Sequence, residues 1–409
     1  MHNADVRMRG FSERISVARF ESVLRDRCAP LPAETVPLAQ AAGRVLAAAA
    51  VSPVDVPAFD RSAMDGYALR SEETFGAGPY NPLTFRVVGE VTPGRTFERA
   101  IVPGEAVRIM TGAPLPPGAD AVLMAEYTSE QNGIMTATEA VSPRKHVGRA
   151  GEDIRRGQEV LPAGRALRPQ DLGVLASIGQ GQVSVLRRPA VTLLITGDEL
   201  LKPGEQPVGA RIVDSNSVML AALIARDGGT VAALQHLPDR RETIAQALRE
   251  APGDLIVTTG GTSVGVEDHA PTLVAELGEL LVHGVAMRPS APTGFGLVGG
   301  RPVFLLPGNP VSCLAAYDFF VRLGLRRLAG RDEAWPYRPV TRRLRSRIVS
   351  QIGRVDYVRV RLEGEEADLL ATSGASILSS TSLAGGFVVV PEGSEGLAAG
   401  DVATVWLYD

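Results

Sequence analysis

The 409-residue sequence has few of the features that would cross-link a chain or anchor it in a membrane. It contains two cysteines, Cys28 and Cys313, too few for a disulfide framework or a cysteine-based zinc site. It has no run of about 18 consecutive apolar residues, so we expect no transmembrane helix. The charged segment 1–20 lacks the apolar core of a secretory signal. These absences predict a reduced, cytoplasmic protein with no membrane partner.

Lysine is nearly absent. Of the 42 basic residues only Lys145 and Lys202 are lysine, which leaves 42 − 2 = 40 arginines. With 46 acidic residues the formal net charge is −4, and without a basic excess we expect no nucleic-acid partner. An arginine where other proteins have lysine can therefore reflect composition. The five histidines show no spacing typical of metal ligands.

The pattern of the sequence changes several times along the chain. Apolar spacing predicts a helix over 12–28, starting near Ser12, and a second helical segment over 36–50 that is broken by Gly43. Short β-branched runs between Pro-Gly turns over 83–142 predict a small β domain. Residues 190–330 alternate strand and helix patterns, which is typical of a parallel sheet covered by helices. Residues 331–409 predict a small β-barrel or sandwich.

Three loops should meet at the carboxyl edge of that parallel sheet, where ligands bind in folds of this class. They are residues 196–199, 258–265 and 306–312. The second contains Gly260, Gly261 and Ser263, and glycine lets the backbone approach an oxyanion closely. In the third, Asn309 is a plausible N-cap, Pro310 the first helical residue, and Ser312 lies in the first turn. Neither loop is a Walker A motif, and together they predict a phosphate site.

Acidic residues accompany these loops. A carboxylate beside a phosphate site is costly unless a cation bridges them or it acts as a base, so we infer Mg²⁺. Asp214 is predicted to cap the following helix, whereas Asp239 either caps a helix beginning at Arg240 or belongs to the site. The segment 59–68 holds two carboxylates, and composition does not decide whether Asp65-Gly66 is a turn or part of a site. The acidic residues near the loops are Asp198, Glu199, Asp214, Asp239 and Asp268.

Seven motifs, in this order and spacing, resemble the MoeA family of molybdopterin molybdenumtransferases. They are FDRSAMDGYALR, MTGAPLPPGADAV, GEDIRRGQEVLPAG, ITGDEL, IVDSN, TTGGTSVG and LPGNPVS. The resemblance runs from about residue 12 to the C-terminus. It implies a homodimer of multidomain α/β and β subunits, in which the α/β crevice faces the Asp65 segment. The implied domains are a linking domain (1–50 with 147–186), an inserted small β domain (51–146), a molybdopterin-binding α/β domain like that of molybdopterin adenylyltransferases (187–330) and a C-terminal β-barrel (331–409).

The resemblance also implies a reaction: adenylylated molybdopterin and molybdate give molybdenum cofactor and AMP, assisted by Mg²⁺. A contact with the molybdopterin adenylyltransferase is a further expectation. The implied catalytic residues are Asp65, Thr111, Asp153, Glu199 and Asp268. The implied substrate-binding residues are Gly260, Gly261, Ser263, Asp239, Arg288, Gly308, Asn309, Pro310 and Ser312, with Asp268 and Asp239 as metal ligands.

The sequence departs from the family beside this site. The family usually has Lys-Pro-Gly-Lys-Pro where this chain has Arg288-Pro289-Ser290-Ala291-Pro292, and His269 replaces the usual Tyr. Arg288 keeps a cation and Ala291 does not, although Arg301 or Arg354 could supply one. Three alternatives stay open: a molybdopterin adenylyltransferase, a divergent paralogue that binds pterin or nucleotide with weak or no turnover, and an enzyme that prefers tungstate.

Overall fold

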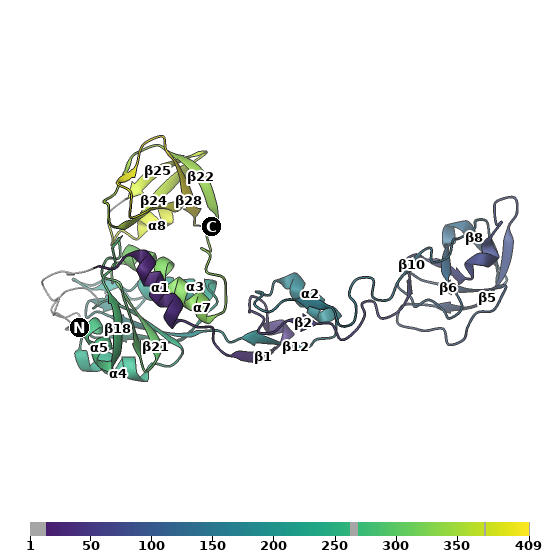
Figure 1. Cartoon of the computed structure of the whole chain (residues 1–409), viewed down its shortest axis with the longest axis horizontal. Coiled ribbons are helices and arrows are strands. Elements are labelled where there is room, and N and C mark those ends of the chain that lie inside the picture. Colours follow the sequence, from purple (N-terminus) through teal and green to yellow (C-terminus); the bar gives the residue numbers. More distant parts are fainter. Residues whose placement is uncertain (1–13, 262–268, 372–373, 409) are drawn as a thin grey trace. The chain divides into compact units, whose positions relative to one another are not determined.

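A computed structural model describes residues 14–261, 269–371 and 374–408 (Figure 1). The chain forms two compact units. Unit 1 comprises the described residues up to Glu34, Gly43–Val45 and the chain from Ser184 onward; unit 2 comprises Thr35–Ala42 and Leu46–Val183. Lys145 is exposed on unit 2 and Lys202 is exposed on unit 1. Within the described ranges no helix has the length and apolarity needed to cross a membrane.

Unit 2 contains a six-stranded sheet in the order β7-β4-β6-β5-β9-β8. Apolar side chains pack on both of its faces, around Phe85 on one and Ile109 on the other. This sheet confirms the predicted β character of 83–142. Its strands are β4 (Gly66–Leu69), β5 (Leu83–Val91), β6 (Glu105–Ile109), β7 (Ala121–Met124), β8 (Thr128–Gln131) and β9 (Ile134–Ala137).

The predicted helix over 36–50 is wrong. The segment instead follows an extended path with one short 3₁₀ turn, η1 (Leu38–Gln40). Gly43 adopts φ +69, which a right-handed helix does not accommodate, and the Leu46 amide donates to the Arg165 carbonyl at 2.9 Å. The other elements outside the large sheets are β1 (Ala33–Pro37), β2 (Ala50–Val51), β3 (Arg61–Ser62), η2 (Ser71–Thr74), η3 (Ala125–Tyr127), β10 (Val147–Gly148), β11 (Glu159–Leu161), α2 (Pro169–Ser177) and β12 (Gln182–Leu186).

The sheet of the α/β part of unit 1 has the order β16-β13-β17-β21-β20-β18. The first four strands are parallel, as predicted, but β20 runs antiparallel to them. The edge strand β18 pairs antiparallel with β20 and therefore runs in the same direction as the first four. Gly299 and Gly300, both at positive φ, connect β20 to β21 in a tight turn, and such a turn joins only antiparallel strands. The strands are β13 (Ala190–Thr196), β16 (Thr230–Leu237), β17 (Leu255–Thr259), β18 (Gly278–His283), β20 (Gly294–Val298) and β21 (Arg301–Leu306).

Helices cover this sheet. The first begins at Val17 rather than near Ser12, because the Ser16 hydroxyl caps it by accepting from the Arg19 amide at 3.2 Å. The closing helix after β21 is continuous but includes a π-helical turn, η4 (Tyr317–Val321). The helices and small strands are α1 (Val17–Arg27), β14 (Leu200–Leu201), β15 (Ile212–Val213), α3 (Asn216–Arg226), α4 (Arg241–Glu250), α5 (Ala270–Leu277), α6 (Pro310–Ala316) and α7 (Arg322–Leu328).

The C-terminal part of unit 1 is a closed barrel, which decides between the predicted barrel and sandwich. Its strands follow the order β24-β25-β22-β28-β26, and β26 pairs with β24 to close the ring. The strand β19 (Met287–Arg288), from the α/β part, pairs with β24. The elements are β22 (Pro339–Leu344), β23 (Ile348–Val349), β24 (Val355–Glu363), β25 (Glu366–Ala371), α8 (Ser379–Leu383), β26 (Gly386–Val390), β27 (Gly396–Leu397) and β28 (Val402–Leu407).

Candidate functional site

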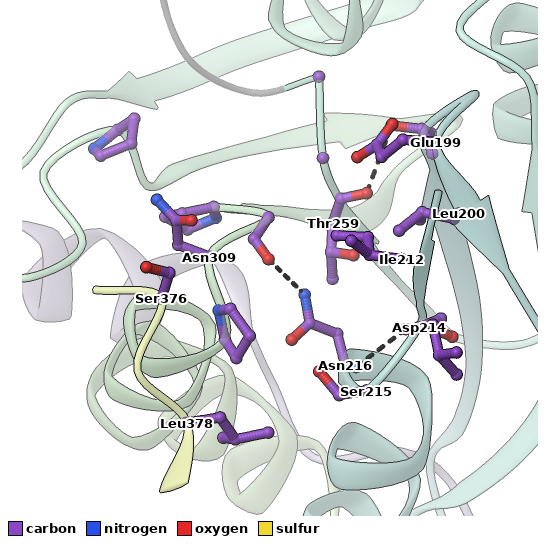
Figure 2. A pocket seen from close by; sticks show the side chains of 18 residues that line it. Glu199, Leu200, Ile212, Asp214, Ser215, Asn216, Thr259, Asn309, Ser376 and Leu378 are labelled. Atoms are coloured by element: carbon purple, nitrogen blue, oxygen red, sulfur yellow. Dashed lines mark hydrogen bonds between the residues drawn. The ribbon is translucent and has the colours of Figure 1, made fainter. Parts of the chain in front are cut away.

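A pocket of about 580 Å³ lies at the carboxyl edge of the parallel strands of unit 1 (Figure 2). All three predicted loops line it: Glu199 from the first, Gly260 and Gly261 from the second, Gly308 and Asn309 from the third. The barrel part contributes one wall through Ser376 and Leu378. The prediction that the loops converge is therefore confirmed. The remaining lining residues are Thr196, Leu200, Ile212, Val213, Asp214, Ser215, Asn216, Thr259, Pro292, Pro307 and Pro310.

The loop after β17 requires glycine at its first position. Gly260 has φ +84, and a Cβ there would lie 2.3 Å from the Thr196 carbonyl oxygen. The next glycine, Gly261, has φ +56. The backbone of this loop therefore packs against β13 and also lines the pocket, where a bound group can approach the main chain closely.

Asn216 connects two walls of the pocket. Its Nδ2 donates to the Gly308 carbonyl at 2.8 Å, and its side chain lies inside the pocket (Figure 2). Its Oδ1 is buried and makes no hydrogen bond to any described residue. A buried acceptor without a partner is costly, so this atom is suited to a donor on a bound ligand.

Asp214 caps α3, as predicted. Its Oδ1 accepts from the amides of Asn216 and Ser217 at 2.9 and 3.1 Å, and His236 Nε2 lies 2.9 Å from its Oδ2. Asn309 and Pro310 begin α6 at the predicted positions, although the Asn309 side chain makes no capping bond. Both helix starts reach the pocket, and the amides at a helix N-terminus favour negative charge there.

Asp239 does not cap α4, because that helix has no side-chain cap and its N-cap residue is Arg240. Burial raises the pKa of the Asp239 carboxyl, the charges of Glu199 and Asp198 raise it further, and a hydrogen bond from Thr196 opposes them. Its Oδ1 is buried with no hydrogen-bond partner among the described residues. A carboxylate oxygen of this kind fits a hard cation such as Mg²⁺. The described ranges contain no group of three or more His, Cys, Asp or Glu residues placed to hold a metal.

A second cavity, of about 370 Å³, shares Pro292 with the first. Four arginines line it: Arg14, Arg288, Arg354 and Arg359. Asp356 is buried behind two of them: Arg288 forms an ion pair with its Oδ2, and Arg354 Nε lies 3.0 Å from its Oδ1. None of the described residues that line the cavity is acidic, so its lining is cationic. We call this space the arginine cavity.

Ala291 lines the arginine cavity together with Arg354. Arg301 does not line it, because its guanidinium is bound to the carbonyls of Leu248, Arg249 and Ala251. Of the two suggested replacements for the missing family lysine, the structure therefore brings Arg354 to the cavity and leaves Arg301 elsewhere.

Unit 2 carries the other candidate catalytic residues. Asp65 Oδ1 accepts from the Thr111 amide at 2.7 Å and from its hydroxyl at 2.8 Å. The Thr111 amide, followed by the Thr111 hydroxyl, lowers the pKa of the Asp65 carboxyl, which stays ionised at neutral pH. Asp153 is exposed on a loop whose backbone bonds to Val56. The sequence did not decide whether Asp65-Gly66 is a turn or part of a site. In the structure, the Asp65 carboxylate has a defined orientation.

The predicted site residues fall into four groups, and Asp239 stands apart because it lines neither cavity. Glu199, Gly260, Gly261, Gly308, Asn309 and Pro310 line the first pocket, while Arg288 and Ser312 line the arginine cavity. Asp65, Thr111 and Asp153 belong to unit 2. Ser263 and Asp268 lie outside the described residues. The sequence did not identify Arg359, Ser376 and Leu378 as lining residues, because the segment 355–378 has no recognisable ligand pattern. Asn216 was also not named as a site residue, although it belongs to the IVDSN motif, which indicated it.

Three family models match this chain. The MoeA N-terminal region (domain I and II) matches residues 15–179, a probable molybdopterin binding domain matches 192–327, and the MoeA C-terminal region (domain IV) matches 341–408. The chain belongs to the MoeA family. The resemblance seen in its motifs is thereby confirmed.

Named relatives cover most of the MoeA-type chain. Molybdopterin molybdenumtransferase 2 of Mycobacterium tuberculosis is 36% identical over 393 residues, covering 93% of this chain and 95% of the relative. A putative molybdopterin biosynthesis protein of Methanocaldococcus jannaschii is 33% identical over 385 residues, covering 91% of each. The crystal structure of a molybdopterin biosynthesis moeA protein from Pyrococcus horikoshii superposes with a TM-score of 0.85 at 34% identity, covering 97% of this chain and 100% of that one.

Proposed function

We propose that this MoeA-family chain is a molybdopterin molybdenumtransferase, which converts adenylylated molybdopterin and molybdate to molybdenum cofactor with release of AMP. Membership of the family gives the chain a role in molybdenum cofactor biosynthesis, and its named relatives are transferases. The finer statement, including the oxyanion and the leaving group, is the proposal.

The observation that carries the proposal is the pairing of two unlike cavities in unit 1. The first is lined by glycine loops, two helix starts and an unpaired Asn216 oxygen, which suits a phosphate-bearing ligand. The second is lined by arginines, and guanidinium groups bind oxyanions through charge-assisted hydrogen bonds. Because Pro292 lines both, a pterin ester in the first and a metal oxyanion in the second would be neighbours.

Mg²⁺ is part of the proposal. Asp239 and the neighbouring Glu199 would hold it, together with Asp268, and when bound it would offset carboxylate charge beside the phosphates. In this scheme Asn216 orients the ligand through its amide, and the Gly260 and Gly261 backbone permits close approach. Glu199, exposed at the pocket rim, acts on the bound substrate as a carboxylate.

Three further points belong to the same proposal. The chain acts as a homodimer, in the cytoplasm, and contacts the molybdopterin adenylyltransferase that makes its substrate. Asp65, with its pKa lowered by Thr111, serves as a second ionised carboxylate in the reaction. Light scattering at micromolar concentration tests the dimer, and a stable monomer would contradict it.

The central test is molybdate-dependent AMP release by the purified chain and by Glu199→Gln. The substitution removes one charge and little volume, and loss of a catalytic carboxylate lowers the rate by about 100-fold or more. Glu205→Gln is the matched control, because Glu205 is exposed on the same connection and does not line the pocket. Wild-type rates in Glu199→Gln would remove this residue from the mechanism, and parallel assays with tungstate establish which oxyanion is preferred.

A further inference from the structure

A buried polar cluster lies between the α/β part of unit 1 and its barrel, and Asp318 is at its centre. Asp318 belongs to the π-helical turn η4 and is 0% exposed. Its carboxylate accepts from the Tyr337 hydroxyl at 2.9 Å, from Arg226 Nη2 at 3.2 Å and from the Tyr357 hydroxyl at 3.3 Å. It lines neither cavity described above.

The cluster continues on the α/β side. Arg226 also donates to Asp227 at 2.8 Å, and the Tyr317 hydroxyl donates to the same carboxylate at 3.1 Å. Arg326 Nη1 reaches the other Asp227 oxygen at 3.1 Å. Such buried ionic groups add little net stability compared with apolar packing, because desolvation offsets their attraction. We therefore attribute a cluster of this size to the relative positions that it fixes for the surrounding residues, rather than to a gain in stability.

Tyr357 connects this cluster to the barrel. It lies on β24 and stacks on Phe387, with ring centroids 4.4 Å apart. Its strand neighbour Asp356 holds Arg288 and Arg354, both of which line the arginine cavity. Two residues further along β24, Arg359 lines the same cavity and donates to Ser380 Oγ at 2.6 Å. The Asp318–Tyr357 hydrogen bond thus ties η4 to the strand that carries the cavity wall.

We propose that Asp318 and Tyr357 are positioning residues that fix β24, and with it Arg354 and Arg359, for oxyanion binding. The proposal rests on the proposed function, in which the arginine cavity receives the oxyanion. A charge-assisted contact depends steeply on distance and angle, so a small movement of β24 weakens several guanidinium contacts at once. Among the described residues of the barrel part, the first pocket is lined by Ser376 and Leu378 alone, so its ligand binding should respond far less.

The test compares two single-hydroxyl deletions in the full chain. Tyr357→Phe removes the hydroxyl through which β24 bonds to Asp318 and also to the Tyr408 hydroxyl, whereas Tyr317→Phe removes an equally buried hydroxyl that binds Asp227 on the α/β side alone. Tyr408→Phe removes only the Tyr408 partner and should leave the molybdate Kd unchanged. Molybdate and AMP binding are measured by calorimetry, and KM for molybdate is separated from kcat. We expect Tyr357→Phe to raise the Kd and KM for molybdate about three- to tenfold, the effect of one lost hydrogen bond, with the AMP Kd unchanged. Tyr317→Phe should leave both constants unchanged, whatever its effect on Tm.

Three other outcomes would contradict the proposal. If both variants lose thermal stability equally and bind molybdate as the wild type does, the cluster is only structural and the positioning proposal fails. If the wild-type chain binds no molybdate, or Arg359→Ala binds it normally, the proposed oxyanion site fails first and this inference with it. Should Tyr357→Phe not fold by circular dichroism, Asp318→Asn replaces the carboxylate that accepts from Tyr357 with an amide of equal volume, and an unchanged molybdate Kd in that variant would also overturn the proposal.

Discussion

The two units offer their candidate residues in contrasting ways. In unit 2, Asp65 is an exposed carboxylate held on one oxygen by Thr111. In unit 1, the candidate residues line two enclosed spaces with buried polar atoms and several guanidinium groups. The comparison distinguishes two kinds of candidate group: unit 1 has buried polar atoms and guanidinium groups suited to anions, and unit 2 has an exposed carboxylate oriented by Thr111.

Of the substitutions that test this comparison, Asp65→Asn should have the largest effect on activity. Because the carboxylate is exposed and its loss changes no volume, the fold should survive, while molybdate-dependent AMP release should fall about 100-fold or more. AMP and molybdate should still bind with wild-type Kd. The matched control is Glu139→Gln, an exposed carboxylate of unit 2 outside the predicted site, which shows whether any charge loss there has this effect. Weaker ligand binding in Asp65→Asn would mean that unit 2 also contributes to affinity.

A smaller effect is expected from Arg354→Ala. The substitution removes one guanidinium from the arginine cavity, and a hydrogen bond to a charged group is worth about 1.5–3 kcal/mol. Molybdate binding should weaken about tenfold or more, and the difference should shrink at high ionic strength because Arg354 is partly exposed. Arg361→Ala on the same strand is the control, since Arg361 is exposed and does not line the cavity. Equal effects of the two variants would indicate general electrostatics rather than a defined site.

The smallest effect is expected from Ala291→Lys, which restores the cation usual in the family. Arg354 already lines the cavity next to Ala291, so a further charge should change the molybdate Kd by less than about threefold, or weaken binding through repulsion. Titrations at two ionic strengths measure it. A tenfold tightening at low salt would instead show that this chain lacks a cation that the cavity needs.

The local sequence predicted the parts of the fold that depend on local pattern. The continuous apolar run of β13 and the alternation after it identified the α/β part, and the Pro-Gly turns identified the β part of unit 2. The three loops at the sheet edge were predicted to meet because parallel strands share one carboxyl edge. The helix predicted over 36–50 failed because Gly43 takes φ +69, a choice imposed by the surrounding packing and not by helical spacing.

Local pattern alone did not predict the arginine cavity; Arg288 and Arg354 were named only in connection with the family resemblance. Arg14, Arg288, Arg354 and Arg359 come from three distant segments, and among 40 arginines none of them stands out by spacing. They meet because β19 pairs with β24, a pairing of a two-residue strand that has no sequence signal. The antiparallel direction of β20 was missed for a related reason: the Gly299-Gly300 turn fixes it, but an apolar run alone does not indicate the direction of a strand.

The placement of the two lysines, one exposed on each unit, gives this chain a built-in pair of reporter positions. Amine-reactive dyes would attach at Lys145 and Lys202 besides the α-amino group, while every arginine of the cavity stays unmodified. Converting either lysine to arginine gives a control with a single side-chain label, which identifies the contribution of each position to the doubly labelled chain without introducing a cysteine. Energy transfer between them would then follow the separation of unit 1 from unit 2 in solution as AMP and molybdate bind.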